Sequence, residues 1–233
     1  MPLLATGIKL VTDTTENESS TVVELLASQV RRDISFGVLL PDSALNIDNL
    51  AQEYGGSAKY LQEALILLSE EALVEVDSHK GFRVASTKRT SINNLEQVRI
   101  EIECIGLEWS LKNGNIHWQG SVLKAQQSLL KTFSQVQFDP QNFFLDWEES
   151  NRHFHNSLLA ACDSQRLIAM QDRLYKQGSP LRQTELEENR IDFQLCIETL
   201  NALVNAILQQ DIDSAKHYLK TFIRCEGKIS NGH

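Results

Sequence analysis

The chain has 233 residues, of which 42% are hydrophobic, and a formal net charge of −9 at pH 7. This length suffices for two modest domains with separate cores, and no apolar run approaches the roughly 20 residues that cross a bilayer. The start, MPLLATGIKLVTD, lacks the basic region and long apolar segment of a secretion signal. The four cysteines are scattered without CxxC spacing, so we expect reduced thiols in a cytoplasmic protein that does not enter a membrane.

The first 85 residues indicate a polar arm, three helices and a hairpin. Residues 1–20 are polar after Thr12 and aperiodic, so we expect a flexible arm. The expected elements are a helix over Thr21–Phe36 that ends at Gly37, a helix over Ile47–Tyr54, a helix capped by Ser57 that runs to about Glu71, and strands at Leu73–Val76 and Phe82–Val84. The apolar face of the first helix is Val22, Val23, Leu25, Leu26, Val30 and Ile34.

Two short helices that meet at a glycine turn, followed by a hairpin, are typical of a winged helix-turn-helix over residues 21–85. The stretch Leu39–Val84 contains, in this order, Pro41, Leu50-Ala51, Ser57, Glu63-Ala64-Leu65, Leu73-Val74 and Gly81-Phe82-Arg83-Val84. With these residues in register, it resembles the DNA-binding domain of GntR-type bacterial transcription regulators. The resemblance implies a regulator that binds double-stranded operator DNA.

The candidate DNA contacts lie on the third helix and in the hairpin. They are Ser57, Lys59, Tyr60, Gln62, His79, Lys80 and Arg83. Gln62 has the paired hydrogen-bonding groups that read adenine, and the lysines can neutralise phosphates. For each of them the competing interpretation is an ordinary solvated surface residue.

Charge argues against strong DNA binding by this half of the chain. Residues 1–90 hold 8 Lys+Arg and 13 Asp+Glu, a net −5, whereas DNA-binding domains usually concentrate positive charge. In the resembling family, basic residues tend to occur where this chain has Asp48, Ala58 and Gln62. The alternative hypothesis is therefore a sensor or interaction protein of this fold whose DNA binding is weakened or lost.

Beyond a polar linker at 86–91, residues 92–228 are nearly all helical by pattern. The expected helices are Ile92–Lys112, Val122–Phe138, Gln141–Ala161, Ser164–Gln177, Thr184–Gln210 and Asp211–Cys225. Short links between amphipathic helices predict an all-α bundle. In the first of them Leu95, Val98, Ile102, Ile105 and Trp109 recur at helical spacing, so we expect this stripe to face the core. The fold class is mainly α.

The second half contains three motifs, Val98-Arg99 with Glu103, Phe154-His155 with Leu158, and Ala206-Ile207 with Asp211 and Ala215. By these motifs it resembles the helical ligand-sensing domain, often called FCD, of the FadR-type branch of the GntR family. Many members of that branch hold a divalent metal on one aspartate and three histidines. Those places fall here on Asn151, His155, Leu200 and Phe222, so we expect no metal and no other cofactor.

The resemblance places a small organic effector, for which a carboxylate is one candidate, inside the bundle. The candidate contacts are Arg99, Asn151, His155 and Asn205, with Arg99 as the anchor for an anion. The competing interpretations are an i,i+4 pair between Arg99 and Glu103 and a satisfied core histidine at His155. No phosphate loop, nucleophile elbow or zinc-hydrolase motif occurs, so an enzyme is not expected.

Together these patterns indicate a ligand-responsive homodimeric transcription regulator. Two winged helices would read the half-sites of a near-palindromic operator, and an effector in the bundle would shift their placement. Neither the effector nor the dimer contact can be identified from one sequence.

Overall fold

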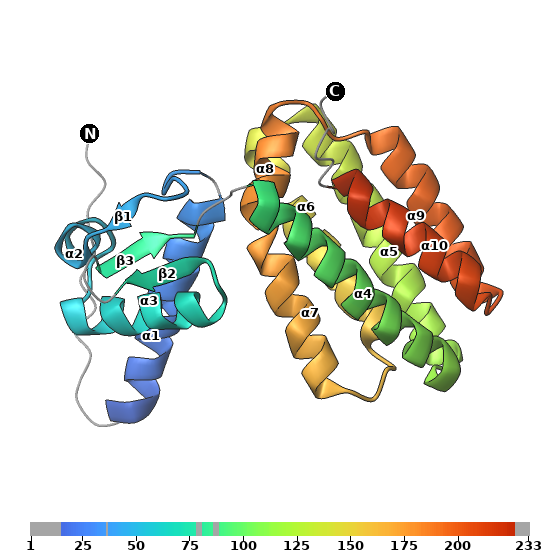
Figure 1. Ribbon diagram of the computed structural model, residues 1–233, viewed down its shortest axis with the longest axis horizontal. Helices are drawn as coiled ribbons and strands as arrows, with labels where there is room; N and C mark the ends of the chain where they lie inside the picture. Colours follow the sequence, from blue (N-terminus) through green and yellow to red (C-terminus); the bar gives the residue numbers. More distant parts are fainter. Residues whose placement is uncertain (1–14, 36, 78–80, 86–88, 227–233) are drawn as a thin grey trace.

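The computed structural model describes residues 15–35, 37–77, 81–85 and 89–226, which form a small N-terminal head and a larger helical bundle (Figure 1). The head contains α1 (Thr15–Ser35), β1 (Ala44–Leu45), α2 (Ile47–Tyr54), α3 (Ala58–Glu70), β2 (Val74–Asp77) and β3 (Gly81–Val84). The bundle contains α4 (Arg89–Asn113), α5 (Ile116–Phe138), α6 (Pro140–Leu159), α7 (Gln165–Gln177), α8 (Ser179–Glu187), α9 (Phe193–Leu208) and α10 (Ile212–Glu226).

The head is a winged helix-turn-helix, as predicted. The turn between α2 and α3 passes through Gly55 and Gly56, whose φ angles of 75° and 86° are readily available to glycine. Ser57 then caps α3, because its hydroxyl accepts a hydrogen bond from the Tyr60 backbone N–H at 3.3 Å. The predicted bounds of α2 and the predicted cap of α3 are confirmed.

A three-stranded antiparallel sheet in the order β1-β3-β2 forms the wing side of the head. The register pairs Val76 with Phe82 in the hairpin and Leu45 with Phe82 across β1. The two-residue strand β1 was not predicted, since two residues give no alternation. Residues 78–80, with the candidate contacts His79 and Lys80, lie outside the described residues.

The first helix is longer than predicted. It begins at Thr15, so residues 15–20, assigned to a flexible arm, are helical. Its buried face is Val23, Leu26, Ala27, Val30 and Ile34, which pack in the same core as α3. Val22 and Leu25 were expected on this face, but both are exposed. The apolar stripe is therefore narrower than predicted.

The bundle is all-α over residues 89–226, as predicted, but one expected helix is two. Thr184–Gln210 was expected to be continuous, whereas α8 ends at Glu187 and α9 begins at Phe193. Asn189 adopts a positive φ of 53°, and the Asp192 side chain caps α9 by accepting from Leu195 N–H. A residue with positive φ commonly ends a helix, and an aspartate commonly caps the start of the next one. Together they interrupt the predicted helix, although the apolar periodicity continues.

The face of α4 that enters the core was predicted only in part, since Ile102 of the predicted stripe packs against that core. The core side chains are Ile100, Cys104, Leu107 and Leu111, while Val98, Ile105 and Trp109 of the predicted stripe are exposed. Both sets recur at helical spacing, so periodicity alone could not choose between them. Helix α4 is consequently apolar on two sides.

The head contacts the bundle mainly through α1 and α8. The Ser179 hydroxyl donates to the Ser35 hydroxyl at 3.2 Å, and both residues are buried. Two open cavities of about 450 and 520 Å³ flank this contact. In the described part of the chain, no helix has the length and apolar character needed to span a membrane.

Candidate nucleic-acid interface and effector site

The outward face of α3 presents two of the predicted DNA contacts to solvent. Lys59 and Gln62, three residues apart and therefore on one face, are exposed. The Lys59 side chain is 80% exposed, and its Nζ lies 3.9 Å from Glu63 Oε1. Such an exposed pair is weak, so Lys59 is free to exchange this carboxylate for a phosphate.

The other described candidates are less available. The Tyr60 side chain is half-buried against the head core, and Arg83 is half-buried in β3 opposite Glu75. The Ser57 hydroxyl already serves the α3 cap. Asp48 is exposed in the first turn of α2. The structure thus leaves Lys59 and Gln62 as the most accessible of the predicted contacts on described residues.

A cluster of four charged or polar groups is buried inside the bundle. Arg99 and Glu103 come from α4, His155 from α6 and Glu226 from the end of α10, and none is more than 5% exposed. Arg99 Nε donates to Glu103 Oε1 at 2.7 Å, and Arg99 Nη2 donates to Glu226 Oε2 at 3.2 Å. The expected i,i+4 pair between Arg99 and Glu103 is therefore present, inside a larger network.

His155 lies between the two carboxylates. Its Nδ1 is 2.5 Å from Glu103 Oε2, and its Nε2 is 3.1 Å from Glu226 Oε1 and 2.9 Å from Arg99 Nη2. Burial by itself would lower the pKa of His155, but the charges of Glu103 and Glu226 outweigh it and raise this pKa. With His155 protonated, the four groups carry two positive and two negative charges, so the cluster is neutral.

The carboxylates respond in the opposite sense. Burial opposes ionisation of Glu103, but His155 and Arg99 together hold its pKa at about 2. Burial also opposes ionisation of Glu226, whose pKa is nevertheless lowered by His155 and Arg99. Both glutamates are therefore ionised at neutral pH, and Arg99 already has two anionic partners from its own chain.

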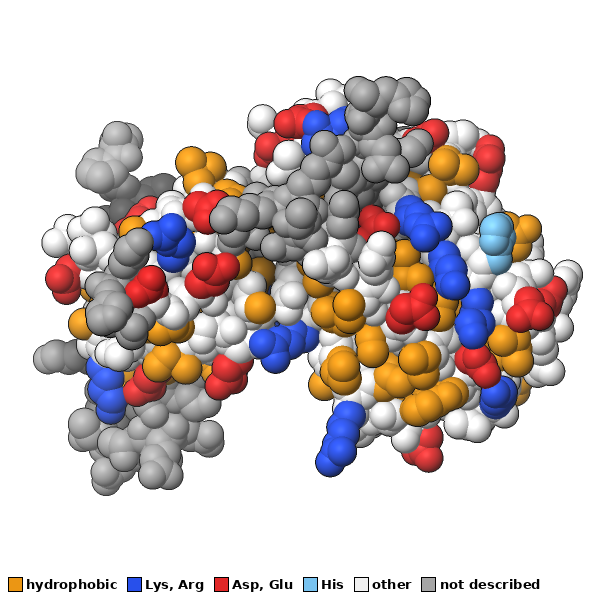
Figure 2. Space-filling view, viewed as in Figure 1, with side chains coloured by type: hydrophobic (Ala, Val, Ile, Leu, Met, Phe, Trp, Pro, Cys, Tyr) orange, Lys and Arg blue, Asp and Glu red, His pale blue; other side chains and the backbone are white. Residues whose placement is uncertain are grey.

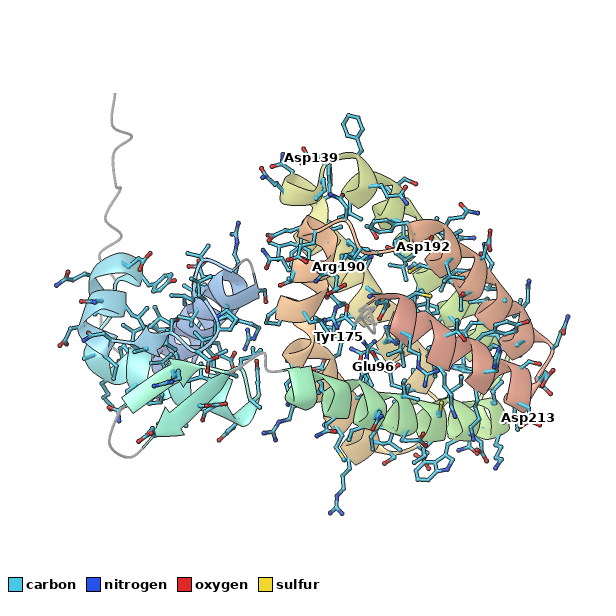
Figure 3. All side chains as sticks on the ribbon, turned by 45° about the horizontal axis from the view of Figure 1, so that its top comes forward. Glu96, Asp139, Tyr175, Arg190, Asp192 and Asp213 are labelled. Carbon is cyan, nitrogen blue, oxygen red and sulfur yellow. The ribbon has the colours of Figure 1, made fainter. Side chains whose placement is uncertain are left out.

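Tyr175 of α7 links this cluster to a second one. Its ring packs against two guanidinium groups, with the ring centroid 4.8 Å from Arg99 Cζ and 3.9 Å from Arg182 Cζ. Its hydroxyl donates to the Glu148 carbonyl at 3.1 Å, and Arg182 forms a two-pronged pair with the Glu148 carboxylate. Figure 3 shows Tyr175 where α4 and α7 meet. Its ring also contacts His155, with the ring centroids 5.6 Å apart.

The predicted effector contacts are only partly brought together. Asn151 lies one turn before His155 on α6 and is fully buried, and neither atom of its side-chain amide has a hydrogen-bond partner among the described residues. Asn205 is exposed on α9 and does not face this interior, which corrects its prediction as an effector contact. Beside Arg99, Arg182 and Glu226 the cavity is only about 30 Å³, room for a single water.

A chain of ion pairs connects the bundle to the recognition helix. Glu71 caps the C-terminus of α3 and accepts two hydrogen bonds from Arg31 of α1, at 2.7 and 2.8 Å. The same carboxylate lies 3.6 Å from Nζ of Lys176, which follows Tyr175 on α7. Lys176 also pairs with Asp172 at 2.9 Å.

Comparison with known proteins identifies both domains. Residues 23–84 match the family model described as bacterial regulatory proteins, gntR family, and residues 95–224 match the FCD domain. The chain belongs to the GntR family, FCD branch. This GntR-family protein is 31% identical over 212 residues to the uncharacterized HTH-type transcriptional regulator BphR of Paraburkholderia xenovorans, covering 90% of this chain and 84% of BphR. It is 27% identical over 195 residues to the HTH-type transcriptional repressor GlaR of Escherichia coli, covering 82% of this chain and 87% of GlaR.

Solved structures agree with this GntR-family fold. The chain superposes on E. coli McbR/YncC with a TM-score of 0.71 at 19% identity, covering 87% of this chain and 93% of the other. A GntR regulator from Rhodococcus sp. RHA1 gives a TM-score of 0.69 at 17% identity, with 88% and 94% covered. The related families and proteins are transcriptional regulators rather than enzymes, as predicted.

The interior of this GntR-family protein does not fit the metal of its branch. Of the four matched places only His155 carries a strong ligand, and both of its ring nitrogens face carboxylates. Phe222 stacks on the His155 ring with centroids 5.6 Å apart, and Leu200 is buried in the apolar core. The Arg99 guanidinium lies against His155 Nε2 and would repel a cation. The donor set therefore disfavours a divalent metal.

Several residues of the site were not predicted from the sequence. Glu226, Tyr175, Arg182 and Lys176 reach it from α10, α7 and α8, far from Arg99 in sequence. The one local signal was a charged or polar residue within otherwise apolar helix faces, and it does not reveal which distant partner compensates the charge.

Proposed function

We propose that this GntR-family transcriptional regulator binds operator DNA as a homodimer through α3 and the β2–β3 wing, and that a small organic effector in the bundle modulates this binding. The observation that carries the DNA-binding part is the helix-turn-helix itself, with Lys59 and Gln62 exposed on one face of α3. Gln62 supplies the paired donor and acceptor that recognise adenine, and Lys59 supplies a phosphate contact.

The test of DNA binding is selection of genomic fragments followed by titration at two salt concentrations. A regulator retains specific fragments, and its affinity falls as salt rises because phosphate contacts release counterions. Gln62→Ala should relax sequence preference, whereas Lys59→Ala should weaken binding to all fragments alike. Lys131→Ala on α5, an exposed lysine of the bundle, is the matched control.

The alternative is a sensor of the same fold that no longer binds an operator. The exposed Asp48 and the net negative head support it. In the same titration, such a protein retains no specific fragment at either salt concentration. That outcome would overturn the DNA-binding proposal.

For the effector, the charges of the cluster favour a carboxylate that competes with Glu226. Arg99 and His155 both contact this carboxylate, which comes from the end of the last described helix. Since the neighbouring cavity holds about one water, an effector enters only when Glu226 and the end of α10 move. Binding is thereby tied to a conformational change, which a regulator requires.

The route to the head runs through consecutive residues of α7. Tyr175 contacts Arg99 and His155, and Lys176 contacts Glu71 at the end of α3. A shift of α7 that follows loss of the Glu226 contact would therefore alter the ion pair that holds the recognition helix. This supports control of the head by occupancy of the bundle.

Acetate tests the anion site without knowledge of the effector. In Glu226→Ala, acetate should refill the space between Arg99 and His155 and raise the melting temperature, because a ligand that binds only the folded state stabilises it. Wild-type protein, and Glu198→Ala with an exposed carboxylate of α9 removed, should respond no more than to chloride. An equal response of all three would refute the site. Native mass spectrometry of purified wild-type protein tests for a retained effector.

A further inference from the structure

The unpartnered side of α4 points to the dimer contact. We infer that a second copy of this chain packs on a stripe formed by Val98, Ile105 and Trp109 of α4 and Met170 of α7, here called the α4–α7 stripe. The inference deepens the proposed function, since it rests on the homodimer proposed there and assigns its interface to particular residues.

The stripe is large, apolar and exposed. Val98, Ile105, Trp109 and Met170 are 49%, 39%, 42% and 50% exposed, respectively. Helices α4 and α7 pack side by side, and Figure 2 shows hydrophobic side chains gathered over them on one face of the bundle. Contiguous apolar patches on a surface commonly mark interaction sites.

The spacing of the stripe fits a helix pair. Val98, Ile105 and Trp109 are separated by seven and four residues, the spacing of an apolar seam between two helices. The core side of α4, with Ile100, Cys104, Leu107 and Leu111, is a separate row. A helix that faces one core needs one apolar stripe, so the second stripe calls for a second partner.

Charges beside the stripe favour a second copy as that partner. Glu101 of α4 and Arg166 and Arg173 of α7 are exposed, and none forms an ion pair or hydrogen bond with any described residue of its own chain. An acidic group on one helix and basic groups on its neighbour make the surface self-complementary. A two-fold axis brings each group of such a surface to its opposite on the other copy.

The helix register places these charges together. Arg99 contacts the Tyr175 ring, and a Cβ on Gly106 would meet Leu167, so α7 runs antiparallel to α4. When two α4 helices pack antiparallel with Val98 opposite the second copy's Trp109, Glu101 lies opposite the second copy's Gly106. The α7 residue that lies beside Gly106 is Leu167, and Arg166 is its neighbour in the sequence. The apolar and charged contacts are thus satisfied by one arrangement.

The first test is sedimentation equilibrium of the full chain. Ile105→Glu should raise the dimer dissociation constant at least tenfold, because it introduces a charge into an apolar contact. Ile116→Glu is the matched control, since Ile116 is 73% exposed at the start of α5 and is not part of the stripe. Circular dichroism verifies that both variants fold. A monomeric wild type, or a dimer equally insensitive to both changes, overturns the inference.

A charge exchange tests the pairing itself. Glu101→Arg and Arg166→Glu should each weaken the dimer, and the double variant should recover most of the wild-type affinity. Independent losses that add in the double variant would exclude this pair. Because single substitutions at exposed positions do not disturb the core, loss of folding does not obscure the result.

Crosslinking provides a direct measure of proximity. The four native cysteines are buried, so Ile105→Cys introduces an accessible thiol near the proposed axis. A short bismaleimide should join two copies through position 105 and leave Ile116→Cys monomeric on a denaturing gel. Equal crosslinking of both would contradict the interface. A wild type that selects operator fragments yet is monomeric refutes the homodimer and its interface but not DNA binding, whereas a dimer that selects none refutes only the DNA-binding proposal.

Discussion

Protonation of the buried His155 affects several contacts inside the bundle. His155 meets Glu103 and Arg99 of α4, Glu226 of α10 and the Tyr175 ring of α7. Removing one member of such a buried network leaves the others uncompensated and costs about 3–5 kcal/mol. The cluster is thus a specific arrangement that tolerates little change, although it need not add net stability over an apolar core.

We predict that the stability supplied by His155 declines as pH rises. Its pKa in the folded state is raised above the ordinary value of 6.5, so its contribution is complete below pH 6.5 and is lost as pH passes through the raised value. Urea unfolding of wild-type protein and His155→Gln between pH 6 and 9 measures this. The difference in unfolding free energy should shrink with pH, and a constant difference would show that folding does not change the pKa of His155.

At acidic pH, the stability supplied by Glu103 changes with pH in the opposite direction. The pKa of Glu103 falls from its ordinary 4.5 to about 2 on folding, so its contribution is present above pH 4.5 and is lost as pH falls toward 2. Glu103→Gln should therefore flatten the loss of stability between pH 4.5 and 2. If Glu103→Gln loses as much stability between pH 4.5 and 2 as wild type, protonation of another group is responsible for acid unfolding.

Asn151 gives a prediction of stabilisation. Its amide is fully buried and unpartnered among the described residues, and an unsatisfied buried polar group costs about 1–3 kcal/mol. Asn151→Leu should therefore raise the free energy of unfolding by about 1 kcal/mol, after some loss to imperfect packing. Thermal or urea unfolding checks this. Destabilisation would indicate that the amide is satisfied in solution, by water or by an effector.

At the scale of elements, caps and turns could be predicted from the sequence, but the face that a helix turns toward the core could not. The Ser57 cap of α3, the turn at Gly55 and the β2–β3 hairpin of the head follow from particular residues, and the structure confirms them. The orientation of α4 depends on which of two apolar rows meets the other helices, which no local pattern contains. The partners of Arg99 likewise depend on tertiary packing.

Ser57 allows a structural and a DNA-binding role to be separated on one helix. Replacing a capping serine by alanine costs about 1 kcal/mol, and by glycine only a few tenths. Ser57→Ala should therefore lower the unfolding free energy of the protein, while Ser57→Gly should nearly preserve it. If the hydroxyl also contacts phosphate, both variants lose DNA affinity to a similar extent in a titration. If only the cap matters, affinity follows stability and the glycine variant binds like wild type.

At the scale of the whole molecule, the contact between head and bundle is small and polar. It includes the Ser35–Ser179 hydrogen bond and the pair between Lys176 and Glu71, whose side chains are 28% and 21% exposed. Partly exposed ion pairs contribute about 0–1 kcal/mol, so this contact orients the head without fixing it strongly. A contact of this strength is suited to a joint that an effector must shift.

We predict that Lys176→Ala loosens the head without unfolding it. Spin labels on Gln52→Cys of α2 and Ser128→Cys of α5, both exposed, report the distance between the domains, and the buried native cysteines leave these sites selective. Dilution with unlabelled chains removes contributions between copies. The distance distribution should broaden in Lys176→Ala and stay narrow in Lys112→Ala, whose pair with Glu108 lies within α4. Since Glu71 retains Arg31 in the variant, broadening would assign the orientation of the head to the α7 contact, and identical distributions would remove α7 from the route between effector and DNA.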